Sequence, residues 1–367
     1  MNLIRENPGI SRLDIANHSK LSPTAITMIT ARLVRGGLLR EEKLPPTMQL
    51  GRRPTALYLE ARSRLAIGVE INPFDAQVVL AELNGRTVEE IDVPANTDAD
   101  AMLAQIHSAI LQLIEKSESP ILGVGVSVPG ILEPATGKVI AATNLRWRNI
   151  EAIAALRRGI DLPFYYDNNS NLSALAEWWF GAPRLSNFVF VTFRGGIGAG
   201  VIAGDHLQEG ASLRMGEFGH MTVAIDGRPC LCGSRGCWEE YASDRAMVRA
   251  YNELGGTADN ALEIVRLARE GDATALRVIE QTADSIALGF GNIVVALNPE
   301  AIIVDDFVAA GWDLFEPIIW KSLRARRQEL WLAGLRLVPS GHASDSSRLG
   351  AVALVLSKYF MESGPLG

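Results

Sequence analysis

All three cysteines of this 367-residue chain lie within eight consecutive positions, at Cys230, Cys232 and Cys237. His220 precedes them, so the spacing is H-x9-C-x-C-x4-C, and three intervening glycines permit the tight turns that would gather the sulfurs. Three thiolates and one imidazole form the closed tetrahedral set typical of structural zinc, with no position open for a catalytic water. We therefore predict a Zn²⁺ ion that organises this loop. The alternative interpretation is three buried or redox-active thiols.

Two glutamates flank the predicted metal loop. Glu217 lies three residues before His220, and Glu239 lies two residues after Cys237. An imidazole bound to a metal through one nitrogen still offers its other N–H to a partner. Two carboxylates and that N–H suit the hydroxyl groups of a sugar, because carboxylates accept the protons that hydroxyls donate. The alternative is that both glutamates are ordinary surface residues.

The composition is that of a globular protein, with 48% hydrophobic and 21% charged residues. The length predicts two or three domains. Three is an odd number of cysteines, which argues against a disulfide framework and favours a reducing compartment. The sequence has no run of about 18 uncharged apolar residues, and MNLIRENPGI lacks the apolar core of a secretory signal. We expect a cytoplasmic protein without membrane association.

The formal charge of −7 is unevenly distributed. Residues 1–60 carry nine basic and five acidic side chains, a balance of +4, so the remainder carries −11. A basic head on an acidic body indicates that only the head meets a polyanion.

Residues 9–42 read as two short helices, a turn and a longer helix, a helix-turn-helix pattern. Ser22 is the expected N-cap of the longer helix, and Pro23 occupies its first position, where the missing N–H costs nothing. The apolar spacing predicts that this helix and the helix before it each pack one face on the core. The residues expected in the core are Ile10, Leu13, Ile15, Ile26, Ile29 and Leu33.

The opposite face of the longer helix presents small hydroxyl side chains, including Thr24 and Thr27. Short polar side chains let a helix approach base edges in the major groove, and Ser22 lies where helix N–H groups meet phosphate. Two predicted strands around a Pro-rich loop follow, and Arg52 and Arg53 in that loop suit phosphate or minor-groove contact. The alternatives are an ordinary three-helix cap and a solvated arginine pair.

The remaining sequence repeats one pattern of elements. Residues 64–94 predict three strands with turns near Asn72 and Asn84, then an amphipathic helix at 98–116 and a buried strand ending at a Pro-Gly turn. The order strand, glycine turn, strand, helices, strand returns after residue 186. The pattern indicates a duplicated α/β fold, with a cleft for a small molecule between two lobes.

These segments resemble the ROK family (repressors, open reading frames, sugar kinases) over nearly the whole chain. The cysteine motif is the most specific match, and residues 123–147 and 209–220 are similar to the family's sugar loop and to the segment that leads into its zinc histidine. The head is similar to the repressor branch, because the kinases of the family lack it. The resemblance implies a winged helix-turn-helix, an actin-like (ribonuclease-H-like) two-lobed body, and a homodimer or homotetramer.

The resemblance also implies which residues contact a sugar. The family's Asn-Leu-x-Trp loop corresponds to Asn144, Leu145 and Trp147, and the position of its catalytic aspartate corresponds to Asn169. The implied sugar-binding residues are Asn144, Asn169, Glu217, His220 and Glu239.

Three departures from the family's kinases argue against phosphoryl transfer. Residues 70–74 replace a glycine-rich phosphate turn, and residues 305–307 replace a late glycine turn with two aspartates and a phenylalanine. Asn169 cannot act as a base at neutral pH, and Asp167 is out of register by two positions. The glycine run at 193–200 is expected to form a tight hairpin rather than a phosphate loop.

The sequence therefore predicts a non-enzymatic, sugar-responsive transcription regulator that acts on operator DNA, and a repressor is the expected form. Its expected domains are 1–60 (winged helix-turn-helix), 61–180 (first lobe) and 181–367 (second lobe with the zinc loop, its C-terminal helix packing back on the first lobe). The rival hypotheses are an active sugar kinase with an accessory head and a module that senses a protein partner. The identity of the sugar, the operator and the sign of the response are left open.

Overall fold

The computed structural model describes residues 1–43, 55–73, 75–181, 184–211, 215–342 and 345–361. The chain divides into two compact units. The first comprises Met1–Ser127, Ile150–Tyr166 and Ala351–Gly367, and the second comprises Val128–Asn149 and Asp167–Gly350. The head and the first lobe thus share one unit, and each unit is built around one five-stranded sheet.

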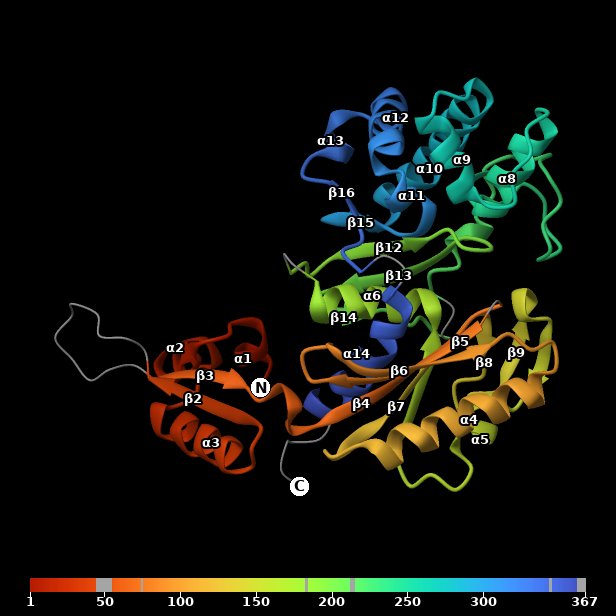
Figure 1. Cartoon of the computed structure of the whole chain (residues 1–367). Helices are drawn as coiled ribbons and strands as arrows, with labels where there is room; N and C mark the ends of the chain where they lie inside the picture. The colour runs from red at the N-terminus through yellow and green to blue at the C-terminus, as the bar shows by residue number, and fades with distance from the viewer. Residues whose placement is uncertain (44–54, 74, 182–183, 212–214, 343–344, 362–367) are drawn as a thin grey trace. The chain divides into compact units, whose positions relative to one another are not determined.

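The head is a winged helix-turn-helix (Figure 1). Ser11 and Ser22 cap the second and third helices by accepting from the backbone N–H groups of Asp14 and Ala25, which satisfies donors that the helices leave open. The strands form a sheet of order β1-β3-β2. The elements are α1 (Asn2–Glu6), β1 (Ile10–Ser11), α2 (Arg12–Ser19), α3 (Pro23–Arg35), β2 (Leu39–Lys43) and β3 (Thr55–Leu59).

The buried face of α3 differs from the expected one by one residue. Ile26 and Leu33 are buried as predicted, but Ile29 is 47% exposed, and Thr30 takes the core position at 2% exposure. At about 100° per residue, position 29 lies about 60° from position 26, whereas positions 30 and 33 lie within about 40° of it. Thr30 is tolerated in the core because its hydroxyl donates to the Ile26 carbonyl oxygen and accepts from Arg12 Nε at 2.7 Å.

The expected apolar side of the first helix is also only partly correct. Ile15 is buried, but Leu13 is 64% exposed, and Ile10 lies in β1 rather than in a helix. Because α2 has only eight residues, or about two turns, its few apolar positions do not define which face is buried.

The sheet of the first lobe has the order β11-β7-β4-β5-β6. The three strands that come first in sequence, β4, β5 and β6, pair antiparallel, and β7 pairs parallel with β4 on the other side. An amphipathic helix, α4, contributes a buried face that includes Met102, Ile106 and Leu113. The elements are β4 (Leu65–Ile71), β5 (Asp75–Glu82), β6 (Thr87–Pro94), α4 (Ala99–Lys116), β7 (Ile121–Val128), α5 (Ala152–Arg157) and β11 (Phe164–Asn168).

The sheet of the second lobe repeats this topology with the order β14-β13-β12-β15-β16. Here too the three strands that come first in sequence, β12, β13 and β14, pair antiparallel. The later strands β15 and β16 then add in parallel on the other side of β12. The predicted duplication is therefore present at the level of strand order. The strands are β12 (Phe188–Thr192), β13 (Gly198–Ala203), β14 (His206–Leu207), β15 (Ala301–Val304) and β16 (Arg336–Pro339).

Helices cover both faces of the second sheet (Figure 1). Val189 and Val191 belong to the hydrophobic core that α10 and α12 complete, whereas Phe188 and Phe190 alternate with them and point to the opposite face, where α6 packs. The helices are α6 (Asn169–Phe180), α7 (Glu239–Ala242), α8 (Asp244–Glu253), α9 (Ala261–Arg269), α10 (Ala273–Leu297), α11 (Asp306–Ala310), α12 (Trp312–Arg326), α13 (Glu329–Leu332) and α14 (Ser346–Met361).

The second unit also holds a small sheet, β10-β9-β8, that leads toward the candidate site. Its strands are β8 (Ile131–Leu132), β9 (Val139–Ala142) and β10 (Trp147–Ile150). Three short 3₁₀ turns complete the described elements: η1 (Ala61–Ser63), η2 (Thr143–Leu145) and η3 (Phe218–His220).

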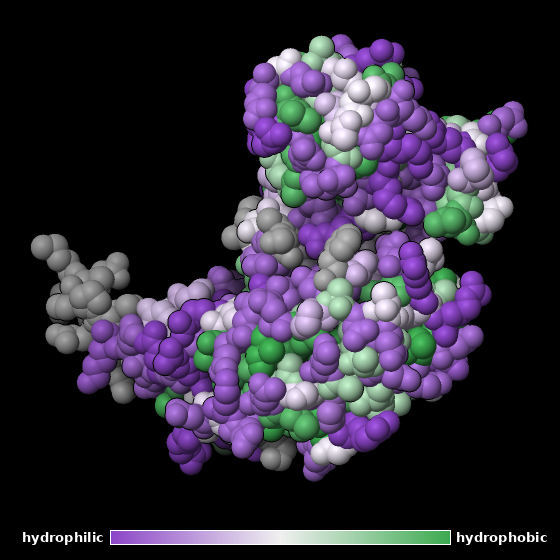
Figure 2. Space-filling model, turned by 45° about the vertical axis from the view of Figure 1, so that its right-hand side comes forward, coloured by the Kyte–Doolittle hydropathy of each residue, from purple (hydrophilic) through white to green (hydrophobic). Residues whose placement is uncertain are grey.

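Hydrophilic side chains cover most of the face drawn in Figure 2, with hydrophobic residues in scattered groups. Among the described residues, no helix combines the length and apolar character that a membrane span requires.

A buried carboxyl group lies at the C-terminal end of β15. Asp305 is 5% exposed, and one of its oxygens, Oδ2, accepts from the Ser346 hydroxyl at 3.0 Å. Its other oxygen, Oδ1, is buried without a hydrogen-bond partner among the described residues. Burial, and secondly the neighbouring charge of Asp306, raises the pKa of Asp305 to about 7, although Arg194 acts in the opposite direction. The protein therefore favours the neutral form of this group.

We predict that Asp305→Asn makes the protein more stable to heat at pH 8, and that this gain becomes steadily smaller as the pH is lowered from about 7 toward the ordinary pKa of an aspartate. Because the folded-state pKa lies above the ordinary value, the contribution of Asp305 is fully present below that ordinary value and is lost as the pH rises through about 7. Thermal unfolding of both proteins between pH 5 and pH 8 measures the difference.

Asp313→Asn is the control. Its hydrogen bond with Arg269 lowers the pKa of Asp313, so its replacement should slightly destabilise the protein at pH 8. An Asp305→Asn effect that is the same at all pH values would contradict the prediction.

Candidate functional site

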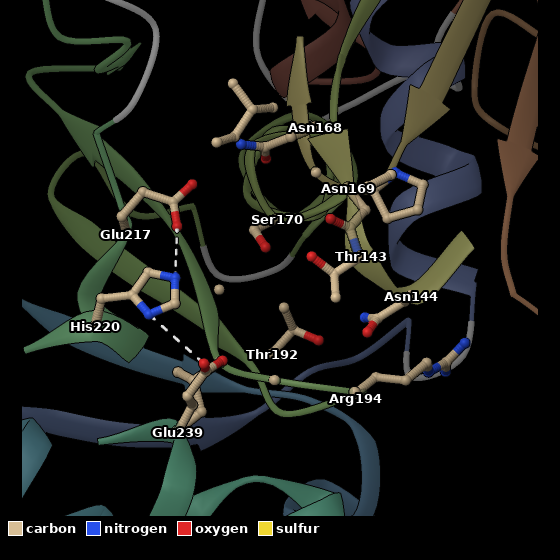
Figure 3. A pocket seen from close by; sticks show the side chains of 18 of the residues that line it. Thr143, Asn144, Asn168, Asn169, Ser170, Thr192, Arg194, Glu217, His220 and Glu239 are labelled. Atoms are coloured by element: carbon tan, nitrogen blue, oxygen red, sulfur yellow. Dashed lines mark ion pairs between the residues drawn. The ribbon is translucent and has the colours of Figure 1, made fainter. Parts of the chain in front are cut away.

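A cavity of about 280 Å³ lies in the second unit (Figure 3). Its walls come from the loop around η2, the start of α6, the turn between β12 and β13, the η3 turn, the cysteine loop and Arg245 of α8. Segments that are up to about a hundred residues apart in sequence therefore converge on one space.

All five predicted sugar-binding residues line this cavity. Asn144 lies in η2, Asn169 begins α6, and Glu239 begins α7. Glu217 directly precedes η3, and His220 ends it. In Figure 3 their polar ends face a common space. The fold thus brings together the side chains that the sequence analysis selected.

The strand-to-helix junction before α6 settles which residue faces the cavity. Asn168 caps α6 by accepting from the Asn171 N–H, which turns Asn169 into the cavity wall. Asp167 is not among the lining residues, because its carboxylate accepts from Asn171 Nδ2 at 3.0 Å and from the Asn168 N–H at 2.6 Å. Burial raises the pKa of Asp167 to about 6. At this junction an amide, rather than the carboxylate of Asp167, therefore lines the cavity.

The glycine run at 193–200 forms the predicted tight hairpin, since β12 and β13 pair antiparallel on either side of it. Its backbone presses directly on the cavity residues. A Cβ atom on Gly195 would lie 2.7 Å from Asn144 Nδ2, and one on Gly196 would lie 2.7 Å from Glu239 Oε2. A side chain at either position would displace the polar end of Asn144 or Glu239 in the cavity, and Gly195 also has a φ of +71°, which favours glycine.

The carboxylates of the cavity lie on either side of the imidazole. His220 Nε2 is 3.8 Å from Glu217 Oε2, and His220 Nδ1 is 3.5 Å from Glu239 Oε1 (Figure 3). Glu239 is almost buried, with Arg245 4.0 Å away, whereas Glu217 is 45% exposed. This arrangement offers strong hydrogen-bond acceptors, and amides beside them, to a polyhydroxylated ligand.

The four predicted metal ligands also converge. The ligand atoms of His220, Cys230, Cys232 and Cys237 all lie within 4.8 Å of one another. Cys230 Sγ is 3.7 Å from His220 Nδ1, and Cys232 Sγ is 3.6 Å from Cys237 Sγ. Around an ion with metal–sulfur distances of about 2.3 Å, neighbouring tetrahedral ligands lie about 3.8 Å apart, so the donor set fits zinc. Cys230 Sγ also donates to Glu239 Oε1 at 2.9 Å.

The electrostatic setting of the thiols is mixed. Burial raises the pKa of Cys230 and of Cys237, whereas a backbone hydrogen bond from Ser234 lowers the pKa of the exposed Cys232. The loop is shaped by Gly236, which has a φ of +70° and whose Cβ atom would lie 1.6 Å from the Ala224 carbonyl oxygen. Only glycine fits this turn.

The predicted DNA-binding residues are only partly described. Thr24 and Thr27 are exposed on α3, and the Ser22 side chain is occupied as the helix cap. Arg52 and Arg53 lie outside the described residues. Met28, which is not among the predicted DNA-binding residues, is 69% exposed on the same face as Thr24. The signal for it was available, because position 28 lies about 200° around the helix from the buried Ile26.

Comparison with known proteins agrees with this geometry. The model of the ROK family matches residues 66–358, and a winged helix-turn-helix DNA-binding model matches residues 1–40. The xylose repressor of Caldicellulosiruptor bescii is 28% identical over 96% of this chain and 93% of its own length.

Two solved structures share the fold of this chain over different lengths. A ROK family transcriptional regulator, described as a homologue of the E. coli MLC protein, aligns with a TM-score of 0.82 and 23% identity over 97% of this chain and 93% of that one. A ROK family glucokinase from Streptomyces griseus, in complex with glucose and AMPPNP, aligns with a TM-score of 0.68 and 27% identity over 79% of this chain and 98% of that one. The xylose repressor and the ROK family transcriptional regulator each align over at least 96% of this chain, and the chain is a DNA-binding transcriptional regulator that belongs to the ROK family.

Proposed function

We propose that this regulator is a repressor whose second unit binds a monosaccharide or a close derivative of one, and that binding releases operator DNA. The observation that carries the proposal is the convergence of two amides, two carboxylates and an imidazole on one cavity. The cavity volume of about 280 Å³ lies near the lower end of the range for small-ligand sites. The repressor name of the relative from Caldicellulosiruptor bescii supports a sugar as the signal.

The effector can change DNA affinity only by binding one arrangement of the protein better than the other. We propose that it does so in a homodimer or homotetramer in the cytoplasm, whose paired heads suit a palindromic operator with half-sites about one helical turn apart.

We predict that one or more sugars from a panel of pentoses, hexoses and amino sugars raise the melting temperature and lower operator affinity. Glu217→Gln should lower the affinity for the sugar that binds by about ten-fold or more, because a hydrogen bond to a charged acceptor contributes about 1.5–3 kcal/mol. Thermal shift and titration calorimetry measure sugar binding, and fluorescence anisotropy measures operator binding.

Glu270→Gln is the matched control, since it also removes one exposed carboxylate but lies just after the end of α9 and is not among the residues that line the cavity. The proposal fails if no sugar changes sequence-selective DNA binding, or if both variants bind the sugar as the unaltered protein does.

We propose that the four converging ligands hold a structural Zn²⁺ ion. The inter-ligand distances of 3.6–3.7 Å support this set, and the orientation of His220 supports it further. Its Nδ1 faces Cys230, whereas its Nε2 faces Glu217 in the cavity wall. When bound, the metal would supply charge and rigidity to the loop and would take no part in chemistry.

We predict that Cys237→Ser loses stoichiometric zinc and weakens sugar binding at the same time, because Glu239 begins the helix two residues after this ligand. Elemental analysis of the purified protein and sugar titration are the measurements. Ser234→Ala, in the same loop but without a ligand atom, should keep both properties. Loss of metal with unchanged sugar affinity would contradict the coupling, and three titratable thiols without metal in the unaltered protein would contradict the zinc site.

We propose that the outer face of α3 reads the operator in the major groove through Thr24, Thr27 and Met28, that the N-terminus of the helix at Ser22 meets phosphate, and that Arg52 and Arg53 add phosphate or minor-groove contacts. Met28 lies at the centre of this face and is apolar, so its natural partner among base edges is the C5-methyl group of thymine. Arg32 and Arg35 in the last turn of the same helix favour approach to phosphate.

We predict that Met28→Ala removes a preference for thymine at one position in each half-site. The probe is the duplex that the full-length chain enriches from a random-sequence library. Replacing the contacted thymine by uracil deletes only the methyl group. It should lower the affinity of the unaltered protein for the duplex about four-fold, since one buried methyl contributes about 0.8 kcal/mol. The Met28→Ala protein should bind both duplexes equally.

Leu262→Ala truncates another exposed apolar residue, in the body, and should leave the thymine preference intact. A Met28→Ala protein that still distinguishes thymine from uracil at every position would rule out this contact.

A further inference from the structure

Three donors at the end of β12 point at one carboxylate. The Thr192 hydroxyl donates to Asp306 Oδ2 at 2.6 Å, and the Phe193 backbone N–H donates to the same oxygen at 2.8 Å. Arg194 Nε donates to Asp306 Oδ1 at 3.0 Å. The Asp306 side chain is only 9% exposed. Both of its oxygens are therefore engaged by three consecutive residues, which we call the 192–194 donor set.

The 192–194 donor set has the chemistry of a phosphate-binding site. A backbone N–H, a hydroxyl and a guanidinium are the groups that proteins use to surround a tetrahedral oxyanion. In this chain an aspartate from a segment more than a hundred residues later supplies the anion instead. The donor set is thus satisfied within the protein.

The backbone of Asp306 accommodates this contact at a cost. Its φ angle is +56°, in the left-handed region that residues other than glycine adopt much less often. Such a conformation persists where the surrounding contacts compensate for it, and here the compensation is the set of three hydrogen bonds. The contact is therefore a built feature of the β15–α11 junction.

The donor set belongs to the wall of the candidate sugar cavity. Thr192 and Arg194 both line it, and Figure 3 draws them beside Asn144 and Glu239. The other arginine among the described lining residues, Arg245, lies 4.0 Å from Glu239. Each guanidinium at the cavity therefore faces a carboxylate of the protein, which leaves amides, carboxylates and an imidazole for hydroxyl groups.

We propose that Asp306 is an internal anion that occupies a phosphate-type site beside the cavity, and that it makes the regulator select an uncharged sugar over its phosphorylated form. This selectivity rests on the proposed sugar-binding function, whereas occupation of the donor set by Asp306 can be tested without any sugar.

The first experiment uses inorganic phosphate as the probe and the full-length protein. Asp306→Gly removes the carboxylate and suits the positive φ, so the variant keeps the backbone conformation and exposes the three donors. We expect it to bind phosphate at least about ten-fold more tightly than the unaltered protein by calorimetry, because hydrogen bonds to a charged acceptor are strong. Asp306→Asn, which keeps the size but loses the charge, is measured as well and serves if the glycine variant does not fold.

Asp313→Ala is the matched control. It also deletes a carboxylate that is paired with an arginine, Arg269, but at an exposed site away from the cavity, so it should gain no phosphate binding. Folded Asp306 variants that bind phosphate no better than the unaltered protein would overturn the proposal.

The second experiment compares the best sugar from the panel with its monophosphate. The unaltered protein should bind the uncharged sugar at least about ten-fold more tightly, and Asp306→Gly should reduce or reverse that ratio. An unaltered protein that prefers the monophosphate would overturn the selectivity while leaving sugar-dependent regulation intact. A protein that binds no sugar in either form would refute the proposed function, and the phosphate titration would still decide the role of Asp306.

Discussion

The candidate site depends on a contact between two stretches of backbone. The segment that carries Glu217 and His220 lies directly on β13, where a Cβ atom on Gly216 would be 1.8 Å from the Ala199 carbonyl oxygen, and one on Gly219 would be 2.2 Å from that of Ile197. Any side chain at these two positions would lift the segment off the sheet. Because glycine permits the contact, a carboxylate and an imidazole are held at fixed places beside the cavity.

The same segment joins the cavity to the cysteine cluster through a single side chain. His220 directs one ring nitrogen toward Cys230 and the other toward Glu217, and Glu239 approaches the imidazole from the thiol side. An ion in the cluster would therefore restrict the orientation of the residues that face a ligand. This is a physical reason for a metal-type cluster to lie next to a ligand cavity in a protein that performs no chemistry on the ligand.

The departures from the kinase pattern are structurally coherent rather than scattered. At the position of a sugar base the cavity wall holds Asn169, while the nearby Asp167 is hydrogen-bonded within the strand-to-helix junction. At the late turn, Asp305 is buried against Ser346, and Asp306 faces the end of β12. The body shares the fold of a ROK family glucokinase, and at these positions its polar groups bond with one another.

The sequence by itself determined the winged head, the duplicated lobes and the residue types of the site, because glycine turns, helix caps and cysteine spacing act locally. It also selected Asn169, rather than Asp167, as the residue that faces the cavity. It misassigned Ile29 and Leu13, since one or two helical turns leave a buried stripe uncertain by one position. Only the tertiary structure decided that Asp306 binds the residues that follow β12, because that contact joins segments more than a hundred residues apart and depends on a positive φ angle that no local pattern of apolar and polar residues encodes.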